Sequence, residues 1–439
     1  MSRLAKGKRV CNEETSGTHS HGVQGYGGNS GDLDHEIAPL TKLQSEPNEH
    51  LRKATVGGLK MPVSTLRMLA ARESNYSGRG RFSLSDSCHV LSRCLPIYGP
   101  QKVDKMQTRA YVSQFSVDGS LFVAGFQGSH IRIYNVDKGW KVQKDILAKS
   151  LRWTITDTSL SPDQRYLVYS SMSPLVHIVN IESAATESLA NVTEIHDGLD
   201  FSPDDNDDDE DFSIFSVKFS TDGRELAVID VNTVCFADES GHVIYSGSDD
   251  HLCKVWDRRC LFTTGQAAGV LTGHLEGITF IDSRGDGRYL ISNGKDQSTK
   301  LWDIRKMTST SPALLTDYPE EERNLKHPQD QSVATYKGHS VLYTLIRCYF
   351  SPAYSTCQKY IYTGSGDSIV YIYDLVSGHQ VARLDHHNEP VRDCSWHPFY
   401  PLMVTSSWDG VIAKWEFPGD RKEKSSSRPR RRSRRAMLY

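Results

Sequence analysis

An alternation of apolar and polar residues recurs along the chain, and each run ends in a turn signal such as Ser-Pro or Asp-Gly. This period of two is typical of half-buried β-strands. The pattern therefore predicts a series of similar β-sheet units, each opening with one of these strands. The seven runs are Tyr111–Ser116, Ile155–Ser161, Ile214–Ser220, Val231–Ala237, Gly277–Asp282, Leu345–Ser351 and Val391–His397.

The distances between successive runs set the size of the units. Measured between one apolar residue near the end of each run, they are 45, 59, 17, 44, 70 and 46 residues; the residues are Phe115, Leu160, Phe219, Phe236, Phe280, Phe350 and Trp396. A four-stranded unit needs about 40–45 residues. The two long intervals contain the acidic stretch 203–211 and the polar stretch 306–332, which we interpret as surface loop insertions. The interval of 17 is too short for four strands.

The short interval predicts a truncated unit near residues 226–231. There the second strand of one unit leads directly into the first strand of the next, so roughly 27 residues are missing by comparison with a full unit. A shortened isoform, an erroneous gene model and a six-bladed ring with an extra hairpin all explain this gap. Because a half unit leaves strand edges unpaired, we expect it to lower stability.

Two neighbouring segments share four residue types at fixed offsets. In each, a serine lies ten positions and an aspartate six positions before a tryptophan, and an aspartate and an arginine lie one and three positions after it. The frame recurs downstream with substitutions, preceded by a histidine. The segments are Ser246, Asp250, Trp256, Asp257 and Arg259, and then Ser292, Asp296, Trp302, Asp303 and Arg305.

Such a repeat is of the WD type, and its polar residues can satisfy one another inside a blade. The aspartate can accept from the histidine ring, the histidine can bond the hydroxyl, and the hydroxyl can accept from the indole N–H. We therefore expect structural roles rather than catalysis or metal binding, within an all-β WD-repeat β-propeller. The expected sets are His274, Ser292, Asp296 and Trp302; His339, Thr363, Asp367 and Tyr373; and His387, Thr405, Asp409 and Trp415.

Composition shifts divide the chain into four parts. Residues 1–32 are polar and glycine-rich and are expected to be disordered. Residues 33–85 carry two short helical patterns and a linker, which fit either a flap on a blade or a docking helix for a partner's groove. Residues 86–417 form the propeller, and residues 418–439 form a basic disordered tail.

Charge and cysteine usage narrow the classes of protein. The net charge is −3, no apolar run approaches the roughly 18 residues that span a bilayer, and no hydrophobic segment follows the basic N-terminus. The nine cysteines show no Cys-x-x-Cys pair, so we expect no metal, no cofactor and a reducing compartment, nuclear and/or cytoplasmic. The tail lacks aromatic residues that would stack bases, which favours nuclear import over nucleic-acid binding. Its arginines are Arg428, Arg430, Arg431, Arg432, Arg434 and Arg435.

An enzyme is disfavoured by the placement of the chemically reactive residues. The serine, histidine and aspartate residues recur in register with the repeat, and no nucleophile with a base stands outside that register. A binding protein is therefore the expectation. A nuclear WD-repeat scaffold that touches nucleic acid through its basic tail is the alternative.

The paired Trp-Asp-x-Arg boxes resemble those of substrate receptors for cullin-four RING ubiquitin ligases. The stretches Ala110–Val142, Leu151–Ser161 and Gly273–Arg305 are similar to the plant LEC-type WD-repeat proteins, relatives of the animal WD-repeat protein twenty-three. The resemblance implies a receptor that links a target protein to the damaged-DNA-binding adaptor of the ligase for ubiquitination and proteasomal degradation. It also implies that the box residues contact the adaptor, although bridging within the chain is the alternative role. These residues are Arg259, Arg305, Asp257 and Asp303.

Overall fold

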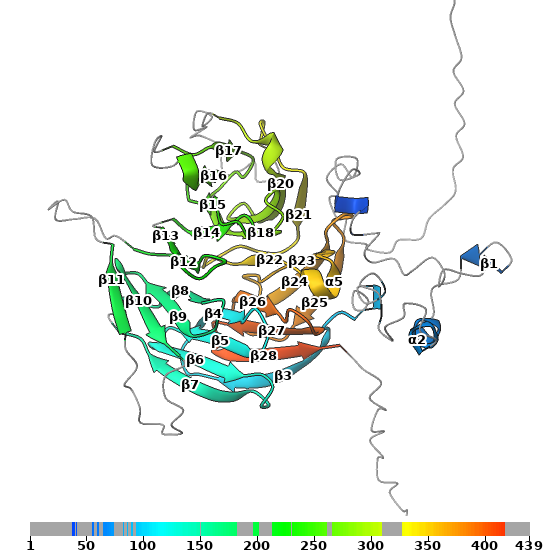
Figure 1. Ribbon diagram of the computed structural model, residues 1–439, viewed down its shortest axis with the longest axis horizontal. Helices are drawn as coiled ribbons and strands as arrows, with labels where there is room; N and C mark the ends of the chain where they lie inside the picture. The colour runs from blue at the N-terminus through cyan, green and yellow to red at the C-terminus, as the bar shows by residue number, and fades with distance from the viewer. Residues whose placement is uncertain are drawn as a thin grey trace, which may run out of the picture.

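Six four-stranded antiparallel sheets and one two-stranded sheet form a ring, and a small pair of strands lies outside it, in the part of the chain that the structure describes. This computed structural model describes residues 94–149, 151–181, 196–201, 213–229, 231–260, 266–309 and 327–417, and in the N-terminal part 37–39, 41, 55–56, 59–60, 65–73, 82, 86 and 89–90. Figure 1 shows the first strand of each sheet around the centre and the last at the periphery. The WD-repeat propeller predicted from the sequence is confirmed.

The blades are numbered here in chain order, and each runs from its inner to its outer strand. Blades 1 to 3 comprise β4 (Ala110–Phe115), β5 (Leu121–Phe126), β6 (His130–Asn135) and β7 (Lys141–Leu147); β8 (Ile155–Leu160), β9 (Tyr166–Ser171), β10 (Leu175–Asn180) and β11 (His196–Asp200); and β12 (Ser216–Phe219) with β13 (Leu226–Ile229). Blades 4 and 5 comprise β14 (Thr233–Phe236), β15 (Val243–Gly247), β16 (Cys253–Asp257) and β17 (Gly269–Leu271); and β18 (Ile278–Ser283), β19 (Tyr289–Gly294), β20 (Ser298–Asp303) and β21 (Ala334–Lys337). Blades 6 and 7 comprise β22 (Cys348–Phe350), β23 (Tyr360–Thr363), β24 (Ile369–Asp374) and β25 (Gln380–Asp385); and β26 (Val391–Trp396), β27 (Leu402–Ser407), β28 (Val411–Glu416) and β3 (Tyr98–Lys105).

Blade 3 is the truncated unit that the spacing predicts. β12 pairs only with β13, in the register Val217 with Val228, and the chain then enters β14 of the next blade. Ser220 N–H donates to Glu225 O in the turn. Ser220 and Glu225 are therefore a hydrogen-bonded pair. Bonded and non-bonded pairs alternate along an antiparallel ladder, so Val217 and Val228 are a non-bonded pair. The N–H and C=O groups of Val228 thus point away from β12. Blade 3 therefore presents an edge where the other blades carry their third strand.

The ring is closed by a strand from before the first blade. β3 pairs with β28, in a register that sets Lys105 opposite Val411, and Met106 N–H donates to Gly410 O. The outermost strand of blade 7 thus comes from the opposite end of the propeller sequence. The alternating runs of the sequence begin at Tyr111, so they did not identify β3.

An even number of strands in every blade fixes the two faces of the ring. Each blade returns the chain to the face from which it started, and blade 3 keeps this parity because it has lost two strands. The turns from first to second strand and the links from third to fourth strand therefore lie on one face, which we call the box face. The links between blades lie on the opposite face.

In the N-terminal part, a short described segment around Ile37 packs into the propeller core. Residues 37–39 and 41 are helical, and Ile37 is buried in a cluster that includes Tyr289 of blade 5 and Tyr373 of blade 6. Of the two interpretations of the helical patterns, packing on a blade is the one observed for this segment. Helix α2 (Thr65–Glu73) and the pair β1 (Thr55–Val56) and β2 (Leu59–Lys60) follow. The two predicted disordered tails lie outside the described residues. So do 202–212, which include the acidic stretch 203–211, and 310–326, which lie within the polar stretch 306–332.

Candidate protein-binding face

The first box lies at the end of β16, on the box face of blade 4. Arg259 Nε donates to Asp257 Oδ1 at 2.9 Å, and its Nη2 donates to Asp257 Oδ2 at 2.6 Å. This fork holds the guanidinium while 64% of the Arg259 side chain stays exposed. The hydrogen bonds from Arg259 lower the pKa of Asp257 to about 2. The pair therefore presents an oriented guanidinium to solvent.

The second box is arranged differently. Asp303 caps the 3-10 turn η3 (Ile304–Lys306), where its Oδ1 accepts from the backbone N–H of Arg305 at 3.0 Å. The same carboxylate receives Nη2 of Arg288 at 2.8 Å, and Arg288 comes from the turn between β18 and β19. Asp303 thus orients Arg305 through its backbone, and the guanidinium fork on Asp303 belongs to Arg288.

A third arginine ties the first box to the truncated blade. Arg258 Nη1 donates to Gly241 O at 2.9 Å, and its Nη2 pairs with Glu225 in the turn between β12 and β13. Arg258 therefore bridges to blade 3, whereas Arg259 pairs with Asp257 of its own blade. The sequence frame marked the third residue after tryptophan and gave no role to the second.

Two of the three expected polar chains lie inside blades 5 and 7. His274 Nδ1 lies 3.0 Å from Asp296, its Nε2 lies 2.7 Å from Ser292 Oγ, and Trp302 Nε1 donates to the same hydroxyl at 2.7 Å. In blade 7 the corresponding contacts are His387 to Asp409 at 3.1 Å, His387 to Thr405 at 2.8 Å and Trp415 to Thr405 at 3.2 Å. His387 lowers the pKa of Asp409 to about 2, although burial acts in the opposite direction.

The third set does not form the expected chain. His339 Nδ1 contacts Tyr373 Oη at 3.2 Å, but its Nε2 contacts Asn293 Oδ1 of blade 5 at 2.9 Å. Thr363 donates to backbone carbonyls, and Asp367 accepts from Tyr371 at 2.7 Å. Tyrosine at the tryptophan position explains the change, because its hydroxyl reaches the histidine directly. Burial lowers the pKa of His339 to about 4, so the ring is neutral.

An ion network at the inner strands was not foreseen from the sequence. Arg347 precedes β22 of blade 6, and its Nη2 donates to Asp157 of β8 at 2.9 Å while its Nη1 lies 3.3 Å from Asp393 of β26. Lys218 of β12 lies 2.8 Å from Asp157. Burial raises the pKa of Asp157, but Arg347 and Lys218 outweigh it and hold that pKa at about 2. The network joins blades 2, 3, 6 and 7 across the centre of the ring.

The sequence did carry a signal for this network. Asp157 and Asp393 occupy the third position of β8 and β26, in strands whose residues are otherwise mostly buried. A carboxylate in such a strand requires a cation or several donors. Sequence spacing does not show that the cation comes from a blade four positions away along the chain.

No group of three or more histidine, cysteine, aspartate or glutamate residues suited to a metal ion occurs among the described residues. The helices within the same residues include none that is long and apolar enough to cross a membrane. The arginines of the predicted nuclear-import tail lie outside the described residues.

Comparison with known proteins agrees with the geometry. The family model described as WD domain, G-beta repeat matches residues 229–257, 265–303, 330–374 and 378–416. A LEC14B homolog from Prunus armeniaca is 62% identical over 472 positions that cover 99% of both chains, and the LEC14B protein of Lithospermum erythrorhizon is 62% identical, covering 88% of this chain and 89% of its own. A DDB1- and CUL4-associated factor 11 homolog from Caenorhabditis elegans is 34% identical and covers 74% of this chain and 64% of its own.

The alignment with the Prunus protein also bears on the truncated blade. Of its 472 positions, this chain fills 99% of 439 residues, about 435, so about 37 positions face no residue here. That excess is large enough to contain the roughly 27 residues absent from blade 3. The full-length match at 62% identity shows the family. The chain belongs to the LEC14B-type WD-repeat proteins, which are related to the DDB1- and CUL4-associated factor 11 homologs.

Proposed function

We propose that this chain is a substrate receptor of a cullin-four RING ubiquitin ligase and that the box face binds the ligase adaptor DDB1. The observation that carries the proposal is the oriented guanidinium of Arg259, held by Asp257 at 2.9 and 2.6 Å and still exposed. Because the guanidinium is already oriented before binding, less conformational entropy is lost when it binds carbonyl or carboxylate groups. The similarity to relatives whose names include association with DDB1 and CUL4 supports the same partner.

The polar chains support a binding role rather than catalysis. His274, His339 and His387 are buried and occupied by hydrogen bonds within or between blades. A buried, fully bonded histidine has no open position from which to transfer a proton to a substrate. The function that we propose is therefore to bring a target protein to the ligase, with ubiquitination and proteasomal degradation as its result.

The direct test is co-precipitation of DDB1 and the cullin with the chain from cells. The variant Arg259→Ala/Arg305→Ala is expected to lose both proteins. A matched control is Arg165→Ala/Arg224→Ala, which removes two exposed arginines from first-to-second-strand turns on the same face. Equal recovery of DDB1 with the box variant and with the control would show that the boxes are not part of the interface. Recovery of DDB1 with none of the forms would refute the receptor proposal.

The place of action is a further part of the proposal. We infer nuclear import from the arginine cluster between residues 428 and 435. Deletion of residues 418–439 is expected to shift a fluorescent fusion from nucleus to cytoplasm without loss of DDB1 binding. An unchanged distribution would contradict this role for the tail.

A further inference from the structure

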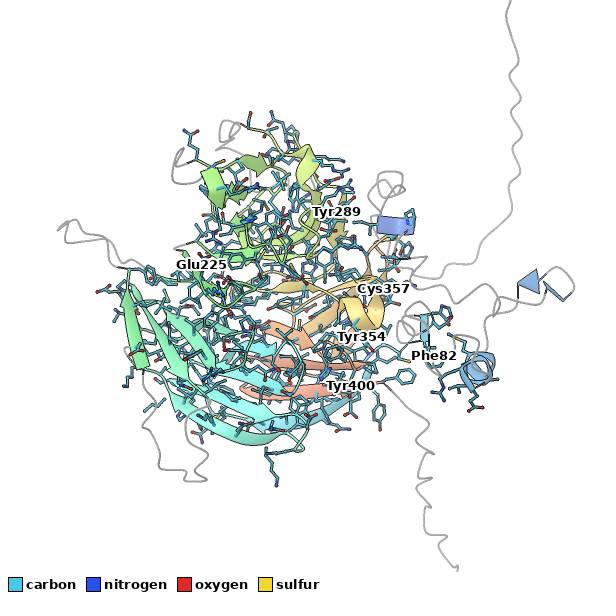
Figure 2. The ribbon with its side chains drawn as sticks, in the orientation of Figure 1. Phe82, Glu225, Tyr289, Tyr354, Cys357 and Tyr400 are labelled. Carbon is cyan, nitrogen blue, oxygen red and sulfur yellow. The ribbon has the colours of Figure 1, made fainter. Side chains whose placement is uncertain are left out.

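Three exposed aromatic side chains gather on the box face of blades 6 and 7. Tyr354 lies in the short helix α5 (Ala353–Thr356) and is 52% exposed, while Phe399 and Tyr400 lie in the turn between β26 and β27 and are 38% and 63% exposed. The rings of Tyr354 and Phe399 meet edge to face with centroids 5.0 Å apart. We call these three residues the aromatic patch. Figure 2 shows Tyr354 and Tyr400 near the same edge of the molecule.

A buried histidine fixes the conformation of the turn that carries Phe399 and Tyr400. The backbone N–H groups of both residues donate to His397 Nδ1, at 3.1 and 3.0 Å. The Tyr400 ring packs on the His397 ring with centroids 4.7 Å apart. On the other side Gly119, at φ +75°, approaches so closely that a Cβ there would lie 2.3 Å from His397 Nε2. The turn is therefore held by groups that have little freedom to move.

The helix that carries Tyr354 is fixed in the same way. The hydroxyls of Ser351 and Thr356 lie 2.6 Å apart, and Thr356 also donates to Pro352 O at 2.8 Å. The helix ends at Thr356 and is capped by Cys357, which adopts a left-handed conformation with φ 55°. The aromatic patch is thus presented by two short, internally bonded segments, so its rings need little further ordering on binding.

The aromatic patch is continuous with the second box. Gln358, two residues after α5, donates from Nε2 to Arg284 O of blade 5 at 2.7 Å. Arg284 begins the turn that carries Arg288, and Arg288 pairs with Asp303 of the box at 2.8 Å. One chain of contacts on one face therefore links the box to α5.

We propose that the aromatic patch is a second contact for the adaptor that the boxes engage, with Tyr354 and Tyr400 entering an apolar depression on that partner. This inference rests on the proposed function. An exposed ion pair contributes at most about fivefold to affinity, so two surface arginines alone do not hold a stable complex. Tyrosine is enriched among the residues that dominate binding energy, because it buries a large surface and loses few rotamers. The aromatic patch supplies the apolar anchor that the boxes lack.

The test measures dissociation of the purified chain from immobilised DDB1. The variant Tyr354→Ala/Tyr400→Ala is expected to dissociate about 30-fold faster. The matched control is Trp153→Ala/Tyr343→Ala, which removes two aromatic residues that are 61% and 78% exposed on the opposite face. The control is expected to dissociate within about twofold of the unaltered chain.

Each outcome separates the aromatic patch from the boxes. Unchanged dissociation of the patch variant, beside loss of binding by Arg259→Ala/Arg305→Ala, overturns this inference and leaves the proposed function intact. No binding by the unaltered chain overturns both. If the patch variant melts at a lower temperature, Tyr400→Arg replaces it, since that single change leaves the ring contact between Tyr354 and Phe399 in place; the same acceleration supports the proposal. A shift from dimer to monomer in sedimentation, with DDB1 dissociation unchanged, would assign the aromatic patch to a second copy of the chain and contradict it.

Discussion

Removal of Arg347 tests the account of the centre of the ring. In the variant Arg347→Met the carboxylates of Asp157 and Asp393 lose a guanidinium from a site where all three side chains are buried. The pKa of Asp157 lies near 2 instead of its ordinary 3.8, so its charged form gains about 2.5 kcal/mol from the network. Lys218 supplies part of that gain and remains in the variant. Loss of the bonds to Asp393 adds to the cost, and we expect about 2–4 kcal/mol of destabilisation in total.

The loss of stability in Arg347→Met should depend on pH, whereas a loss caused by a packing defect should not. Because the folded-state pKa of Asp157 is depressed, the stability that it contributes is present above pH 4 and is lost as the pH falls toward 2. Urea unfolding should therefore show the largest gap between Arg347→Met and the unaltered chain near pH 7 and a smaller gap near pH 3. Adding Asp157→Asn and Asp393→Asn should recover most of the loss at pH 7. A gap that is independent of pH, or a triple variant that loses the sum of the single effects, would refute the reasoning.

Three further outcomes are expected. Asp282→Asn should stabilise the chain at pH 7.5 but not at pH 4. Burial raises the folded-state pKa of Asp282 to about 7, so the free energy of unfolding falls as the pH rises from 4 to 7. An equal gain at both pH values in urea unfolding would contradict this. His274→Ala should lower the free energy of unfolding by about 2–3 kcal/mol, since it leaves both Asp296 and the Ser292 hydroxyl that binds Trp302 without the histidine. Calorimetric melting should show a smaller loss of stability for Tyr373→Phe, which removes one hydroxyl contact. Restoring two strands to blade 3 should raise the melting temperature by several degrees, and equal melting temperatures would show that the open edge of β13 carries no cost.

The sequence was most informative where a local pattern repeats. All seven inner strands lie within or next to the alternating runs, including β12 and β14, whose close spacing identified the truncated blade. The alternation reports one buried face of a strand, which depends only on the strand itself. The strands β4 to β12 lie before the four stretches matched by the family model, so pattern reasoning located blades that lie outside those stretches.

Features that depend on distant partners could not be read from the chain. β3 does not alternate clearly, and it is defined by its pairing with β28, more than 300 residues away. The His339 side chain turns toward Asn293 because Tyr373 occupies the place of a tryptophan, and only the packed blades show which neighbour it meets. Arg347, Asp157 and Asp393 come from three inner strands or their approaches, and no spacing rule joins them.

The candidate site was predicted in part for the same reason. The boxes were found from offsets within single blades, so Arg259 with Asp257 followed from the sequence. The partner of Asp303 comes from the turn between β18 and β19, which the offsets do not include. Tyr354, Phe399 and Tyr400 stand in two different blades, and only the structure shows them as one surface.

The measurement that tests the central claim most directly is a titration of purified DDB1 with the purified chain by calorimetry. We expect a saturable one-to-one complex for the chain as it stands, with blade 3 truncated, and about 25-fold weaker binding by Arg259→Ala/Arg305→Ala, about fivefold for each arginine, at an unchanged melting temperature. Binding only after blade 3 is restored would mean that the truncated ring does not present the box face. Equal affinity of the box variant, or no complex with either form, would contradict the claim that the box face is the adaptor-binding surface.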